Sequence, residues 1–146
     1  MRIKQQKSGL VKEFIPINPE IKGIEVSRSG KIVLFAIFNT STLKSEIIAA
    51  KFNQHLEIVA SFDLSFNQLG KPRRLKRVKG TDIILIGMRK SLVVVDFNES
   101  ENRFVLLKEL DKVCKSDIVD FEFRDGMLFV KGYQEDYISV LNFNVE

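Results

Sequence analysis

The sequence predicts an all-β protein built from repeated sheets, and three observations support this class. Twelve Phe residues and many Ile and Val residues occur with no Trp and only three Pro among 146 residues. Aromatic and β-branched side chains pack well on a pleated sheet, so this composition favours strands over helices. Short apolar runs alternate with turn residues and recur about every 45 residues. We therefore expect a soluble, compact chain of antiparallel strands.

The predicted strands of the first half begin in an N-terminal segment, residues 1–20, with a strand at 11–17. A first repeat, residues 21–65, follows it. It contains four predicted strands at 21–28, 31–38, 46–52 and 56–64. The turn residues Ser29-Gly30 separate the first two of them.

Two further repeats, residues 66–110 and 111–146, complete the chain. The second repeat predicts four strands, at 73–79, 82–88, 91–97 and 103–110. The third repeat predicts three strands, at 118–124, 127–132 and 137–143. Asp125-Gly126 joins the first two of these, a dipeptide typical of a two-residue hairpin turn.

A Phe-Asn pair marks the end of the third strand in each repeat. The three Phe residues are Phe52, Phe97 and Phe143, which lie 45 and 46 residues apart. The residue before each Phe is Lys51, Asp96 or Asn142, and the strand alternation places these three on a less buried side. Self-similarity at a fixed period of 20–50 residues is the sequence signature of a repeat architecture.

A four-stranded unit of this length, closed by an aromatic and a small polar residue, resembles the WD40 family of β-propellers. Phe-Asn would occupy the Trp-Asp position of that family. The resemblance covers residues 21–146, although the Gly-His dipeptide of the family is absent from all three units. It implies three WD40-like, four-stranded antiparallel blades.

The strand count carries a further expectation about association. The repeats supply four, four and three strands, and the strand at 11–17 brings the total to twelve, so that strand is expected to complete the last blade and close the ring. Three blades are fewer than the usual four to eight. An arc of three blades leaves two apolar sheet faces uncovered. We therefore expect either a partial propeller or a ring closed by association, as a homodimer of six blades, with another propeller fragment or as part of a longer chain.

The Phe and Ile positions are expected to form the core between blades. They follow the period of two that places alternate side chains on one face of a strand.

The densest charge cluster lies in the first strand of the second repeat. Six basic residues occur within nine positions, and we call them the basic patch: Lys71, Arg73, Arg74, Lys76, Arg77 and Lys79. Such a cluster can bind an acidic protein segment, or phosphates of nucleic acid or anionic lipid. The alternative is a strand whose charged side chains are simply solvated, which is commoner for a charge run.

The chain lacks the constellations that catalysis or metal binding requires. The single histidine, His55, lies in a polar turn, and the single cysteine, Cys114, has no partner at ligand spacing. The carboxylates of the third repeat are interpreted as one solvated strand face, and they are Asp117, Asp120, Glu122 and Asp125. We expect no enzyme activity, no cofactor and no metal.

Two function classes remain. The first is a protein-interaction scaffold that binds a protein partner through loops, a blade edge or the basic patch. The second is a phosphate-recognition module centred on the basic patch, for which salt dependence is the discriminating property. A single cysteine and the absence of a long apolar run predict an intracellular protein, cytoplasmic or nuclear, with no membrane span.

Overall fold

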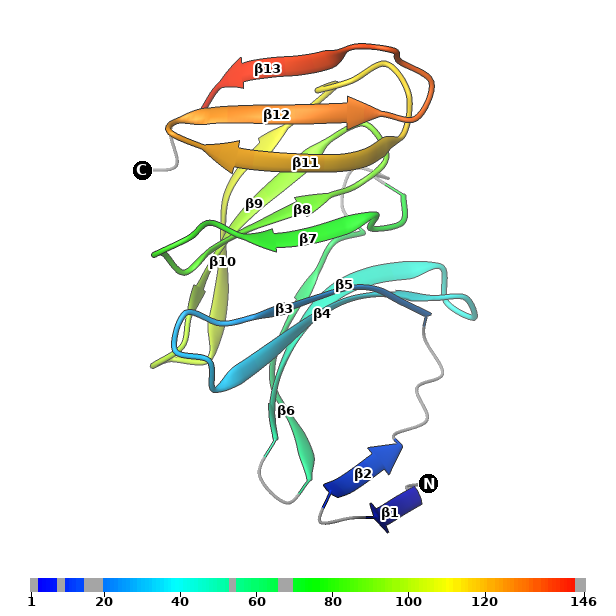
Figure 1. The fold of residues 1–146 in the computed structure, drawn as a ribbon, viewed down its shortest axis with the longest axis vertical. Helices are drawn as coiled ribbons and strands as arrows, with labels where there is room; N and C mark the ends of the chain where they lie inside the picture. The colour runs from blue at the N-terminus through cyan, green and yellow to red at the C-terminus, as the bar shows by residue number, and fades with distance from the viewer. Residues whose placement is uncertain (1–2, 8–9, 15–19, 53–54, 66–69, 144–146) are drawn as a thin grey trace.

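The computed structural model describes residues 3–7, 10–14, 20–52, 55–65 and 70–143 of the chain, and the side chains of residues 20 onward. Thirteen strands make up the regular structure of these residues. Eleven of them form three antiparallel sheets that follow one another along the long axis of the molecule (Figure 1). The predicted all-β class is therefore confirmed.

The first sheet is a four-stranded meander. Its strands pair in chain order and are β3 (Glu20–Val26), β4 (Ile32–Asn39), β5 (Lys44–Phe52) and β6 (Leu56–Asp63). The turn between β3 and β4 contains Gly30 with a φ of 79°, a conformation that glycine adopts without steric cost. The amide of Gly30 donates a hydrogen bond to the carbonyl of Ser27 and closes this turn.

The second and third sheets repeat the same consecutive pairing. The second sheet contains β7 (Arg74–Arg77), β8 (Ile83–Gly87), β9 (Leu92–Asn98) and β10 (Arg103–Leu110). The third sheet contains β11 (Ile118–Arg124), β12 (Met127–Gly132) and β13 (Ile138–Asn142). Asp125 and Gly126 both have positive φ angles, as a type I′ hairpin turn requires, so the predicted turn is confirmed.

The N-terminal strand pairs differently from the prediction. A strand does form in this region, β2 (Leu10–Phe14), but it pairs with β1 (Ile3–Lys7) as a two-stranded hairpin. Within the described residues the third sheet contains three strands, so the expected fourth strand from residues 11–17 is not part of it. A neighbour only two residues away can close a hairpin at little entropic cost, whereas pairing with β13 would close a loop of most of the chain.

The three sheets pack face to face through two apolar cores. Each sheet has an upstream face, toward the preceding sheet, and a downstream face, toward the next one. The first core joins the downstream face of the first sheet, with Leu34 and Ile47, to the upstream face of the second, with Ile86 and Val93. The second core joins the downstream face of the second sheet to the upstream face of the third.

Strand register shows that the three repeats are structurally equivalent. The residues before the repeated Phe each pair with the first residue of the preceding strand. The pairs are Lys51 with Ile32, Asp96 with Ile83, and Asn142 with Met127. Residues that lie the same number of positions from these pairs are therefore equivalent, and their side chains point to the same face in all three sheets.

The expectation that the Phe and Ile positions are core is correct for the second repeat and incomplete for the others. Phe97 and Phe143 are buried on upstream faces, at 1% and 6% exposure. Phe52 occupies the same position in the first sheet and is 53% exposed, because neither of the other two stacked sheets covers that face. The Asn that follows Phe52 and the Asn that follows Phe143 lie outside the described residues.

Candidate functional site

The basic patch lies on and around β7, the first strand of the second sheet. This strand runs beside β3 of the first sheet and beside β11 of the third (Figure 1). Leu75 and Val78 turn into the two cores and anchor the segment, while the basic side chains between them reach toward the neighbouring sheets. The patch therefore sits between two junctions of the molecule.

Three basic side chains form ion pairs with the third repeat. Arg73 pairs with Asp117 at 2.9 Å, Arg74 with Asp120 at 2.7 Å, and Lys76 with Glu122 at 2.5 Å. The hydrogen bond from Lys76 is the main reason why the pKa of Glu122 lies below its ordinary value. Of the carboxylates interpreted as a solvated face, Asp120, Glu122 and Asp125 are exposed and Asp117 is half-buried. All but Asp125 also bridge the second and third sheets.

The remaining members of the patch contact the first sheet or the solvent. Arg77 donates from its backbone amide to the carboxylate of Glu25 at 3.0 Å and from Nε to the carbonyl of Val26 at 3.0 Å. The ammonium of Lys71 lies 4.6 Å from the centre of the Phe38 ring, a cation–π contact. Lys79 is exposed. Partner binding by the patch stays a prediction, and most of its charge already serves contacts between sheets.

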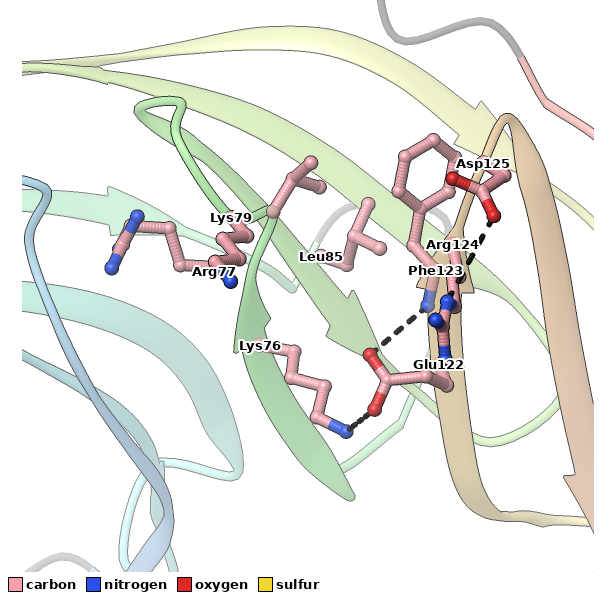
Figure 2. A pocket seen from close by; sticks show the side chains of 9 residues that line it. Lys76, Arg77, Lys79, Leu85, Glu122, Phe123, Arg124 and Asp125 are labelled. Atoms are coloured by element: carbon pink, nitrogen blue, oxygen red, sulfur yellow. Dashed lines mark hydrogen bonds and ion pairs between the residues drawn. The ribbon is translucent and has the colours of Figure 1, made fainter.

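A pocket of about 700 Å³ opens between the first strands of the second and third sheets (Figure 2). Leu85 and Phe123 supply apolar surface. Charged side chains surround them, and these are Lys76, Arg77, Lys79, Glu122, Arg124 and Asp125. The charged residues of the second sheet are all basic, whereas those of the third repeat are two carboxylates and one guanidinium, so the pocket has an excess of positive charge.

The upstream face of the first sheet is another candidate site, because it is apolar and partly exposed. Ile24 and Val26 from β3 and Ile58 from β6 are 60%, 41% and 61% exposed. They share the face with half-buried Phe35 and Ile48 from the two central strands. Contiguous apolar surface of this kind marks an interaction site on a protein.

The downstream face of the third sheet is a second uncovered surface. Phe129 on β12 lies opposite Val140 on β13, and Lys131 lies opposite Ile138. Ile138 and Val140 are both more than half exposed, and Phe129 is 37% exposed. β13 is also an edge strand among the described residues, with one side unpaired within its sheet.

In the described part of the chain the single histidine and the single cysteine lie apart from each other. His55 lies exposed just before β6, while Cys114 is buried in the second core. Burial raises the pKa of the Cys114 thiol, which donates a hydrogen bond to the carbonyl of Ser116, so a reactive thiolate is disfavoured. Among the described residues no group of three His, Cys, Asp or Glu side chains is arranged to hold a metal ion. The same residues include no helix that could cross a membrane.

One feature escaped the sequence analysis. It is Glu135, whose carboxylate accepts hydrogen bonds from the Ser116 hydroxyl and from the amides of Lys115 and Ser116. These bonds, with the hydroxyl of Ser116 as the main cause, lower the pKa of Glu135 to about 2. The exposed apolar face of the first sheet, by contrast, agrees with the expectation that an arc of three blades leaves its outer sheet faces uncovered.

No protein-family model and no curated protein matches the chain significantly. The functional argument therefore rests on the geometry of the three sheets.

Proposed function

We propose that the chain is a non-enzymatic protein–protein interaction module built from β-propeller-like repeats, and that its partner binds the upstream face of the first sheet. The observation that carries this proposal is the exposure of repeat positions that are buried elsewhere in the same molecule.

Three features support the propeller-like interpretation. Each sheet is a meander of consecutive strands. The first strands, β3, β7 and β11, lie next to one another, as the inner strands of propeller blades do. The strand that ends in Phe keeps the same register in all three sheets.

Two repeat positions define the binding face. The first is the repeated Phe, exposed at Phe52 and buried at its two equivalents. The second lies on the first strand of each sheet, where Leu75 and Phe121 are 6% and 2% exposed but Ile24 is 60% exposed. In the second and third sheets the preceding sheet covers these positions, so the first sheet presents a surface of the kind that another sheet covers.

Photo-crosslinking in the cells that make the protein tests this proposal. A benzophenone amino acid at Ile24 should yield crosslinked protein adducts after irradiation. The matched control carries the same group at Leu107, an exposed leucine at the bulge of β10, whose sheet is covered on both faces. Adducts at position 24 and none at 107 would support the proposal, while a chain without adducts at position 24 would contradict it.

Phosphate recognition by the basic patch has less support as a second function. Arg73, Arg74 and Lys76 already pair with carboxylates, so an anion would have to displace them. Phosphate binding weakens steeply as salt rises, whereas an apolar contact does not, so salt dependence distinguishes the two functions.

A further inference from the structure

Resting on the proposed function, we infer that the partner on the upstream face of the first sheet is a second copy of this chain. The second copy docks with the downstream face of its third sheet, head to tail. Each copy then contributes one upstream and one downstream face, and two copies related by a twofold axis cover all four.

The argument begins with the two junctions inside the chain, which use the same pair of faces. At the first junction the downstream residues Leu34 and Ala36 meet the upstream residues Ile84 and Ile86. At the second junction Leu85 and Val94 of the second sheet meet the upstream face of the third. The molecule therefore contains one kind of contact, downstream face to upstream face, made twice.

At each end of the stack, one face of the kind that forms these junctions does not pack against another of the three sheets. The upstream one is the face around Ile24 and Phe52, and the downstream one is the face around Phe129 and Val140. Phe129 is the register equivalent of Leu34 and Leu85, which are both buried at the internal junctions. In a second copy Phe129 would therefore contact the upstream face in the way that Leu34 and Leu85 contact the upstream faces inside this chain.

The composition of β4 agrees with a covered upstream face. Every residue from Ile32 to Phe38 is apolar, so the strand carries apolar side chains on both faces. A continuous apolar run is typical of a strand that is buried on both sides. On the upstream side of β4 Ile37 is buried in the isolated chain, but Val33 and Phe35 remain half-buried.

Head-to-tail contact predicts a specific outcome for face-breaking variants. Ile24→Lys damages the upstream face, and Val140→Lys damages the downstream face. In a dimer of either variant with itself, both contacts contain one damaged face. In a mixture of the two variants, one contact joins the intact upstream face of one chain to the intact downstream face of the other.

The experiment measures molar mass by light scattering after size exclusion, over a dilution series. The wild type should reach about twice the 16.8 kDa mass of one chain. Each variant alone should remain at the mass of one chain, and an equimolar mixture should recover dimers at several-fold higher concentration than the wild type requires. Leu107→Lys serves as the control and should dimerise like the wild type.

Several outcomes would overturn the inference. A wild type that is monomeric at every concentration would do so, and so would a Val140→Lys variant that dimerises normally while Ile24→Lys does not, because that pattern indicates contact between two upstream faces. If a lysine variant fails to fold, a chain with cysteines at positions 24 and 120 replaces it, because position 120 is the register equivalent of Gly23, which lies against Leu75, the equivalent of Ile24. Under mild oxidation this chain should form intermolecular disulfides, and the single cysteine variants should not.

The failure of this inference can be told apart from the failure of the proposed function. A monomeric chain that forms adducts with a different protein through position 24 overturns the second-copy inference and leaves the interaction module supported. A monomeric chain with no adduct at position 24 contradicts both.

Discussion

The second sheet and the first sheet are built from similar strands but differ in how many faces are covered. Leu92, Val93, Val94 and Val95 in β9 alternate between the two cores, and none is more than 1% exposed. In β4 the residues of the downstream face are equally buried, whereas Val33 and Phe35 on the other face are not. The comparison teaches that strands of the same apolar composition lie both where a sheet is covered on two faces and where one of its faces is partly exposed.

The largest expected effect comes from truncating a buried residue of the second sheet. A truncation on the exposed face of the first sheet serves as the comparison. Ile86→Ala removes a fully buried side chain from the first core and should lower the free energy of unfolding by about 2–5 kcal/mol. Ile24→Ala, on the uncovered face, should change it by less than about 0.5 kcal/mol in the monomer. Urea denaturation at low protein concentration measures both. Equal losses would mean that the upstream face is already covered within one chain.

A close approach between the first two sheets gives the next largest effect. A Cβ atom at Gly23 would lie 2.9 Å from the Cβ of Leu75 and 3.2 Å from its backbone nitrogen. Gly23→Ala should therefore push β3 away from β7 and destabilise the chain by about 1–3 kcal/mol. Thermal unfolding followed by circular dichroism measures this change, with Ile24→Ala as the neighbouring control. An unchanged midpoint would show that this junction is loosely packed.

The smallest expected effect concerns the third sheet, which depends more on polar loop contacts. The pKa of Glu135 is lowered to about 2 in the folded chain, from an ordinary value of 4.5. A lowered pKa means that the ionised group stabilises the fold above pH 4.5 and that this contribution disappears as the pH falls toward 2.

Glu135→Gln should remove this contribution, so the wild type should be the more stable at neutral pH and the difference should shrink between pH 4.5 and 2. Urea midpoints measured across this range test the prediction, and Glu109→Gln on β10 serves as the comparison variant. A difference that stays constant with pH would show that ionisation of Glu135 does not contribute.

The strands were predictable because their signals are local. All eleven strands of the three sheets lie within a few residues of their predicted bounds, since apolar runs and turn residues such as Asp125-Gly126 act over short distances. The pairing of β2 was not predictable in the same way. Its apolar pattern indicates a strand but does not say which edge it joins.

The candidate sites could be predicted only in part, because they depend on contacts between repeats. The basic patch and the carboxylates of β11 were each visible in the sequence, but their partnership across 44 to 46 residues was not. Likewise, Phe52 and Phe97 have the same local sequence context, and only the stacking order of the sheets makes one exposed and the other buried.

The consecutive pairing of strands also affects how the chain can fold. Within the three sheets every strand pairs with its sequence neighbour, so each sheet can form from one short stretch of chain as that stretch leaves the ribosome. Contacts close in sequence form quickly, because little chain entropy is lost in closing them. The growing chain therefore passes through stages in which each new sheet covers the face left open by the one before it.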